Sequence, residues 1–285
     1  VGSSVKPMLV EMGFEVLAPE REFLYDSPES LLPLIENASI VIHLAGAPIA
    51  TRWTRKYKDE IYHSRVSTTK NLAKAISMAS AKLKLFLCAS AVGIYPDSGL
   101  HDEFIEKTGT GFLARVCSDW EKASCEVPHE VRVVNLRFGL ILGSNGGALP
   151  KIVFPFRFYS GAWFGSGLQW ISWVHLLDAV EIMRFVIINS AITGPVNVVA
   201  PNPIRSKEFT RLLSSVLNRP AWLPVPEFVL QCLLGEGATV LTRGQASVPK
   251  KLLDAGYQFL YPDLFDALKN LLKGSGSAKQ KLHCL

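Results

Sequence analysis

The chain has 285 residues, of which 48% are hydrophobic and 19% are charged, and this balance excludes a largely disordered protein. Thirty lysines and arginines against 25 acidic residues give a net charge of +5. These charges are scattered rather than gathered into the basic stripe of a nucleic-acid-binding protein, so we expect no nucleic-acid partner. No apolar run reaches the length of a membrane span, and no secretory signal begins the sequence, so we expect no membrane partner.

The five cysteines are widely spaced and form no C-x-x-C motif, and the six histidines are dispersed. This pattern argues against a disulfide framework and against a metal site. We therefore expect a protein of the reducing cytoplasm that binds no metal. The sequence predicts no particular oligomeric state.

Short apolar segments alternate with amphipathic segments along most of the chain. We expect strands at 14–18, 39–46, 85–90, 131–136 and 196–199, and helices at 28–37, 53–80, 111–125 and 176–189. Such β-α alternation is typical of a parallel sheet with helices on both faces. We therefore predict an α/β fold with a doubly wound, Rossmann-type sheet.

The sequence changes character after about Gly146, where glycine, proline and tryptophan become frequent. Helices are expected at 206–217, beginning with an N-cap serine, and at 226–234 and 262–272, each with proline in its first turn. We predict a dinucleotide-binding domain over 1–146, completed by 172–200, a smaller α+β lobe over 147–272, and a flexible tail over 273–285.

Ligands of doubly wound folds bind at the carboxyl ends of the strands, so the residues that follow each strand are candidates. Glu20 and Arg21 follow the first strand. Arg21 would suit the 2′-phosphate of NADP, and Glu20 would suit the 2′-hydroxyl of NAD. The small residues after the second strand would let the backbone approach a flat ligand closely; they follow Leu44 as Ala45 and Gly46.

Polar side chains follow the next two strands. Ser90 ends the third strand and can hydrogen-bond a reacting carbonyl or hydroxyl group, with Tyr95 five residues beyond it. Arg137 follows the fourth strand. The stretch 163–178 holds three tryptophans together with His175, and it predicts either a ligand pocket or an aromatic core between the lobes.

A complete phosphate-binding glycine fingerprint is absent from the sequence. The chain opens with Val1-Gly2 directly before a helix-like segment. Gly2 would then be the last glycine of a fingerprint whose strand and loop, the first strand of the fold, are missing from this chain. Losing a central strand would expose two ladder edges.

Several sequence blocks together resemble one family. They include 41–46, 64–66, 90–95, 120–121, 137–143, 165–175, 194–203 and 249–256. The chain resembles the short-chain dehydrogenase/reductase superfamily in its extended or atypical branch. It is most similar to the epimerase family proteins, NAD-dependent epimerase/dehydratase-like oxidoreductases with a C-terminal domain of unknown function.

The resemblance implies that the chain binds NADP(H). Arg21 stands where the family places its phosphate-reading arginine, which favours NADP over NAD. The residues expected to touch the cofactor are Gly2, Glu20, Arg21, Leu44, Ala45, Gly46, Glu60, Arg65, Ser90, Arg137 and Ile141.

The superfamily's catalytic Tyr-x-x-x-Lys pair is missing, and Val116 and Trp120 occupy its two positions. In the superfamily the tyrosine is the general acid or base, and the lysine lowers its pKa. Ser90 remains, and Tyr95 and His175 are the proposed substitute proton donors, with Cys117 as a further candidate.

Two functions follow from these observations. The first is an NADP(H)-dependent oxidoreductase or epimerase-like enzyme that acts on a small carbonyl or sugar-like substrate. The alternative is an NADP-binding protein with little or no catalysis, acting in redox sensing or as a scaffold. Loss of the catalytic pair favours the alternative, and the tryptophan-rich stretch favours the enzyme.

Overall fold

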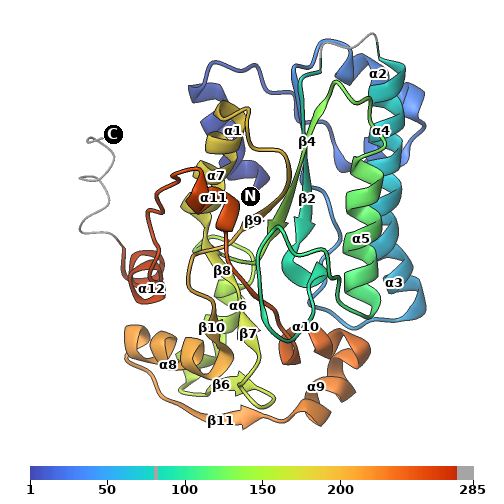
Figure 1. Cartoon of the computed structure of the whole chain (residues 1–285). Coiled ribbons are helices and arrows are strands. Elements are labelled where there is room, and N and C mark those ends of the chain that lie inside the picture. The colour runs from blue at the N-terminus through green and yellow to red at the C-terminus, as the bar shows by residue number, and fades with distance from the viewer. Residues whose placement is uncertain (80–82, 275–285) are drawn as a thin grey trace.

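A parallel sheet forms the centre of the protein (Figure 1). The computed structural model describes residues 1–79 and 83–274. Four strands pair in the order β1-β2-β4-β9, and each neighbouring pair is parallel. Their bounds are β1, Ile40–His43; β2, Leu85–Ala91; β4, Arg132–Phe138; and β9, Gly194–Val198. The predicted α/β fold with a Rossmann-type parallel sheet is confirmed.

Helices cover both faces of this sheet (Figure 1). One face carries α1 (Gly2–Glu11), α7 (Leu176–Ile188) and α11 (Lys250–Asp254), and the other carries α2 (Pro28–Ile35), α4 (Thr68–Met78) and α5 (Phe112–Ser124). Successive side chains of a strand point to opposite faces. In β2, Leu85 and Leu87 therefore join the first core, while Phe86 and Cys88 join the second.

The expected strand at 14–18 is not formed, so this prediction is wrong. Among the described residues, β1 pairs with β2 on one side and with no strand on its other side. The 14–18 segment therefore makes no ladder of backbone hydrogen bonds with β1. Phe14 and Val16 nevertheless pack against the same core as Ile40 and Ile42. The strand expected at 39–46 is formed as β1, and it is mostly half-buried because it lies at the edge of the sheet.

The long helix expected at 53–80 is divided into three parts. Helix α3 (Arg55–Tyr62) passes through a π-helical turn, η2 (His63–Ser67), into α4. Its expected end at Ser80 lies outside the described residues. The other helices and strands of the sheet domain lie within a few residues of their predicted bounds, as is usual for helix ends.

A second, smaller lobe packs below the sheet (Figure 1). Its core gathers side chains from α6 (Leu149–Val153), the 3₁₀ helix η4 (Phe154–Phe158), α8 (Ser206–Leu217) and α12 (Leu264–Lys273). The lobe also contains α9 (Glu227–Leu234), η5 (Gly235–Ala238) and α10 (Thr239–Thr242). The remaining short 3₁₀ helices are η1 (Arg21–Tyr25) and η3 (Val92–Ile94).

Short strand pairs join the parts of the chain. They are β5 (Leu140–Leu142) with β8 (Trp173–His175), β6 (Gly161–Phe164) with β11 (Ala221–Val225), β7 (Trp170–Ile171) with β10 (Ile204–Arg205), and β3 (Leu100–His101) with β12 (Ala246–Ser247). Only β7 and β10 are antiparallel among these pairs.

Three helix starts of the lobe differ from the predicted pattern. Ser206 is the first residue of α8 rather than its N-cap, which is Arg205. Pro226 is the N-cap of α9, and Asp263 caps α12 by accepting hydrogen bonds from the backbone N–H groups of Phe265 and Asp266. Most of the predicted tail, residues 275–285, lies outside the described residues.

Candidate functional site

A buried polar network occupies the carboxyl end of β2 and β4. Ser90 pairs in register with Arg137 across the two strands, and both side chains reach Glu121 on α5. The Ser90 hydroxyl donates to Glu121 Oε1 at 2.6 Å. Arg137 donates Nε to Oε1 and Nη2 to Oε2, both at 2.8 Å, so the ion pair is bidentate.

The Glu121–Arg137 pair is largely withdrawn from water, with 13% and 9% of the two side chains exposed. Burial alone would lower the pKa of Arg137, but the hydrogen bonds and charge of Glu121 raise it above its ordinary value. Arg137 is therefore a fixed cation that holds the carboxylate in place. Glu121 in turn orients the Ser90 hydroxyl.

Tyr95 extends the network to the next strand. Its hydroxyl accepts a hydrogen bond from Arg137 Nη1 at 2.7 Å and donates to Asn197 Oδ1 on β9 at 2.8 Å. The ring stacks on His101 with centroids 5.2 Å apart. Burial raises the pKa of Tyr95, although Arg137 opposes this. The tyrosine thus stays neutral, and its proton is held by an acceptor inside the protein.

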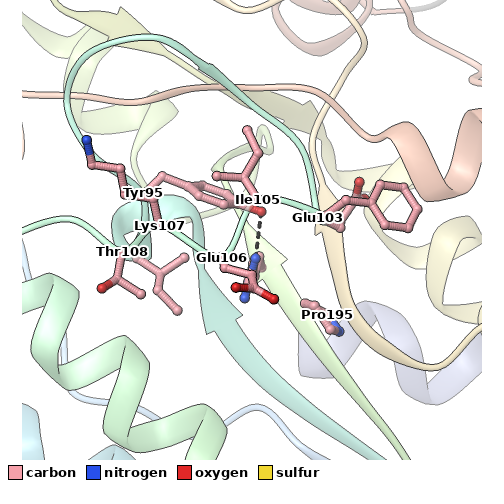
Figure 2. Close-up of a pocket in the computed structure, with 10 residues that line it drawn as sticks. Tyr95, Glu103, Ile105, Glu106, Lys107, Thr108 and Pro195 are labelled. Atoms are coloured by element: carbon pink, nitrogen blue, oxygen red, sulfur yellow. Dashed lines mark hydrogen bonds between the residues drawn. The ribbon is translucent and has the colours of Figure 1, made fainter.

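A pocket of about 190 Å³ lies beside Tyr95 under the loop that follows β3 (Figure 2). Figure 2 shows Tyr95 among Ile105, Glu103 and Lys107. Glu103 fastens this loop, because its carboxylate accepts the backbone N–H of Asn197 at 2.9 Å and that of Lys251 at 3.2 Å. The pocket therefore has walls from β4, β9 and the 103–108 loop, and Arg137 reaches into it.

His175 does not join this network. It is the N-cap of α7, where Nδ1 accepts the backbone N–H of Leu177 at 3.0 Å and Nε2 lies 3.3 Å from Asn270 Oδ1. The ring stacks on Tyr261 with centroids 4.0 Å apart. Burial lowers the pKa of His175 to about 4. These contacts make His175 a neutral capping residue between α7 and the lobe.

The two positions of the missing catalytic pair are buried on α5. Val116 and Trp120 are 1% and 5% exposed, and both belong to the packed interior. The guanidinium of Arg65 lies 5.4 Å from the Trp120 ring centroid, which is a cation–π contact. Burial raises the pKa of Cys117 to about 12, which keeps its thiol protonated.

The loop after β1 is tied to the π-helical turn. Ala47 N–H donates to Ser64 Oγ at 3.0 Å, and Arg65 Nη2 donates to the Ala47 carbonyl at 2.9 Å. A Cβ added to Gly46 would lie 3.1 Å from the Arg65 guanidinium, which explains why a small residue stands there. The predicted cofactor residues Leu44 and Ala45, half-buried, are part of this same loop.

Two of the predicted cofactor residues, Arg21 and Arg65, are arginines that lack a carboxylate partner among the described residues. Burial lowers the pKa of Arg65, and among its charged neighbours Arg21 lowers it further. Arg21 is exposed and donates to the Tyr25 hydroxyl at 3.0 Å. Neither arginine forms an ion pair with a carboxylate of residues 1–79 or 83–274. The exposed guanidinium of Arg21 suits a phosphate group.

The remaining predicted cofactor residues lie on several elements. Gly2 is the first residue of α1, where a Cβ would meet open space, and Glu20 is the N-cap of η1. Glu60 is exposed on α3. Ile141 is half-buried on β5 and packs against the core of the sheet.

Sequence reasoning missed three members of the network: Glu121, Asn197 and Glu103. Glu121 and Asn197 lie in the family blocks 120–121 and 194–203, which indicate a family and not a site, and no sequence signal marks Glu103. In the aromatic stretch 163–178, Trp173 is buried in the lobe core, and Asp178 accepts the backbone N–H groups of Leu260 and Tyr261. The contacts of Trp173 and Asp178 are therefore those of a structural core. Neither the pocket beside Tyr95 nor a second pocket in the smaller lobe is lined by residues of the stretch 163–178.

Within residues 1–79 and 83–274, no group of three or more histidine, cysteine or acidic side chains is placed to hold a metal ion. None of the helices in these ranges combines the length and apolar character needed to cross a membrane.

Comparison with known families decides where the chain belongs. The NAD dependent epimerase/dehydratase family matches residues 3–199, and a domain of unknown function, DUF1731, matches residues 225–271. The chain belongs to the NAD dependent epimerase/dehydratase family. This confirms the resemblance found in the sequence, including the C-terminal domain of unknown function.

Relatives of this epimerase/dehydratase chain span bacteria and plants. The epimerase family protein YfhF of Bacillus subtilis (strain 168) is 41% identical over 250 residues, which cover 86% of this chain and 81% of that protein. The chloroplastic homolog of epimerase family protein SDR39U1 from Arabidopsis thaliana is 40% identical over 243 residues, covering 84% of this chain and 70% of that protein.

Solved structures agree with this assignment. The human epimerase family protein SDR39U1 (isoform2), solved with NADPH, superposes with a TM-score of 0.85 at 29% identity and covers 96% of each chain. MoeE5, solved with UDP-glucose and NAD, has a TM-score of 0.75, covering 96% of this chain and 94% of that one. At 17% identity, MoeE5 shows that the fold is shared and nothing more.

Proposed function

We propose that this protein is an NADP(H)-dependent oxidoreductase or epimerase-like enzyme that acts on a small carbonyl or sugar-like molecule. The observation that carries this function is Arg21, an exposed arginine that forms no ion pair with a carboxylate of residues 1–79 or 83–274. A guanidinium group suits the additional 2′-phosphate that separates NADP from NAD. The human relative solved with NADPH supports the same choice.

The residues present fit a dinucleotide at this place. Leu44, Ala45 and Gly46 form a loop of small residues whose backbone a flat ligand can approach, and Ser64 and Arg65 hold that loop in position. Bound NADP(H) would supply or accept the hydride. The chain's own contribution is therefore to bind the substrate oxygen and to manage its proton.

Ser90 is the proposed substrate-binding hydroxyl. Because Ser90 donates its proton to Glu121, its oxygen has lone pairs free to accept a hydrogen bond from a substrate hydroxyl. Tyr95 is the proposed proton donor, since Arg137 links its hydroxyl to the carboxylate that orients Ser90. The Tyr95 hydroxyl donates its proton in a hydrogen bond to Asn197 Oδ1. This hydrogen bond must break before the proton can pass to a substrate, so we expect slow turnover.

A second candidate function has its own supporting observation. Val116 and Trp120 stand buried where the catalytic pair would be, and both hydroxyl protons of the network are donated within the protein. These features favour an NADP-binding protein with little or no catalysis. A screen of small carbonyl compounds and sugars for NADPH consumption separates the two, because only the enzyme consumes NADPH.

The cofactor assignment is tested by calorimetry with NADPH and NADH. Arg21→Ala should weaken NADPH binding about tenfold or more, because a charge-assisted phosphate contact contributes roughly 1.5–3 kcal/mol. NADH binding should be nearly unchanged. Arg211→Ala, an exposed arginine on α8, is the matched control and should bind both cofactors as the parent does. Equal losses for NADPH and NADH in Arg21→Ala would show that Arg21 does not contact the 2′-phosphate.

A further inference from the structure

A second pocket, of about 340 Å³, lies in the smaller lobe, away from the residues assigned to the cofactor and substrate. Its size is at the lower end of the range of small-molecule sites, ~300–1,000 Å³. It is formed at the ends of α6, α8 and α12 and by η4, and its lining residues are Val153, Phe156, Arg157, Leu217, Arg219 and Leu272.

The floor of this pocket is apolar and already packed. Phe156 and Val153 are 1% and 7% exposed and belong to the core of the lobe. Leu217 and Leu272 pack against the same core from α8 and α12. A hydrocarbon group resting on this floor would therefore gain contacts without any rearrangement of the lobe.

Strand pairing brings the two arginines of the pocket to one rim. Strands β6 and β11 are parallel, and their register places Gly161 opposite Ala221. Arg157 lies in η4, which precedes β6, and Arg219 lies in the connection that precedes β11, so the segments before the two strands are neighbours. A Cβ at Gly161 would stand 2.6 Å from the Pro220 carbonyl oxygen, so glycine is what permits this close approach.

The backbone around Arg219 is held in an uncommon conformation. Tyr159 and Asn218 are the non-glycine residues with positive φ among those described, at 57° and 52°. A left-handed conformation is sterically unfavourable for a tyrosine. At Tyr159 it sets the ring 4.0 Å below the Arg219 guanidinium. Because the ring covers only the face of the guanidinium, the N–H groups at its edge stay free to donate two hydrogen bonds to an anion.

Neither Arg157 nor Arg219 has its charge neutralised by a carboxylate of the described ranges. A cation near a helix C-terminus is stabilising, and Arg219 follows the end of α8. That effect does not account for Arg157, which lies within the 3₁₀ helix η4. Two cations above a preformed apolar floor are the chemistry of a site for a ligand that is anionic at one end and apolar at the other.

We propose that this pocket binds a small amphiphilic anion, a phosphate or carboxylate group carried on a short hydrocarbon. The head group would lie between Arg157 and Arg219, and the hydrocarbon would rest on Phe156, Leu217 and Leu272. The site is independent of the NADP(H) assignment, since no residue of that assignment lines it.

The test is calorimetric titration of the full chain with octyl phosphate below its critical micelle concentration. Octanoate, 1-octanol and inorganic phosphate are titrated alongside it. Octyl phosphate and octanoate should bind, and 1-octanol and inorganic phosphate should each bind at least tenfold more weakly. Inorganic phosphate binding as tightly as octyl phosphate would refute the apolar part of the site. No binding of either amphiphile would refute the whole site.

Variants separate the site from adventitious binding. Arg157→Gln and Arg219→Gln should each weaken octyl phosphate binding about tenfold, which corresponds to about 1.4 kcal/mol. Arg211→Gln, on an exposed part of α8 outside the pocket, is the matched control. Thermal unfolding of each variant establishes that it is folded. Unchanged affinity in both pocket variants, at the level of the control, would overturn the assignment of the two arginines and with it the site.

Discussion

The Glu121–Arg137 ion pair should be among the most sensitive points of the structure. Its side chains are 13% and 9% exposed, which places it with buried rather than surface ion pairs. Removing one partner of a buried pair leaves an uncompensated charge and costs about 3–5 kcal/mol. Glu121→Leu and Arg137→Met should therefore each lower the free energy of unfolding by about this amount.

The double variant distinguishes a lost pair from lost packing. With both charges replaced by apolar groups, no charge is left buried, so the double variant should lose less stability than the two single variants added together. The coupling free energy should be at least about 1 kcal/mol, within the usual range of roughly 0.5–3 kcal/mol for residues in contact. Equilibrium urea unfolding at pH 7, followed by tryptophan fluorescence and by circular dichroism, measures all four proteins.

An exposed pair in the same protein serves as the control. Lys250 and Asp254 lie 2.9 Å apart on α11 with 48% and 55% of their side chains exposed. Lys250→Met should cost far less than either single variant of the buried pair, as is usual for surface pairs. If Glu121→Leu costs no more than Lys250→Met, or if the losses of Glu121→Leu and Arg137→Met simply add, the reasoning from burial is wrong.

Two further predictions concern histidine and tyrosine. The pKa of His175 in the folded protein, about 4, lies below its ordinary value of 6.5, so the unfolded chain takes up the proton first as the pH falls. Neutral His175 therefore contributes about 3 kcal/mol to the free energy of unfolding above pH 6.5, and this contribution is lost as the pH falls from about 6.5 to 4. His175→Gln should flatten the profile of stability against pH in this window. His129→Gln, at an exposed site, is the control and should leave the profile unchanged. For any carbonyl compound that consumes NADPH, Tyr95→Phe should lower kcat by ~10²–10⁴-fold at saturating cofactor, and kcat equal to that of the parent would exclude Tyr95 as the proton donor.

Much of the fold was predictable because each strand of the sheet carries its own signal. The segment that became β2 is apolar on both faces over most of its length, which is typical of a strand buried between two helical layers. The 14–18 segment has a similar apolar pattern but forms no strand. A strand depends on a neighbouring backbone as well as on its own residues, and a local pattern does not report that neighbour.

The candidate site was predictable in part for the same reason. Ser90 and Arg137 were found because both stand at strand ends, where position along the chain fixes position in the sheet. The partners of these residues are not local: the hydrogen bond from Ser90 to Glu121 spans 31 residues, and that from Tyr95 to Asn197 spans 102. His175 shows the converse, since its residue type suits proton transfer while its surroundings at the start of α7 commit both ring nitrogens.

The two backbone hydrogen bonds to Glu103 also set an order of events during synthesis. The carboxylate joins Asn197, which lies 94 residues later in the chain, and Lys251, which lies 148 residues later. At a translation rate of ~5–20 residues per second, the second partner is made roughly 7–30 s after Glu103 itself. The loop over Tyr95 therefore closes only when nearly all of the described chain has emerged from the ribosome, and the nascent protein carries an open Ser90–Glu121–Arg137 network until then.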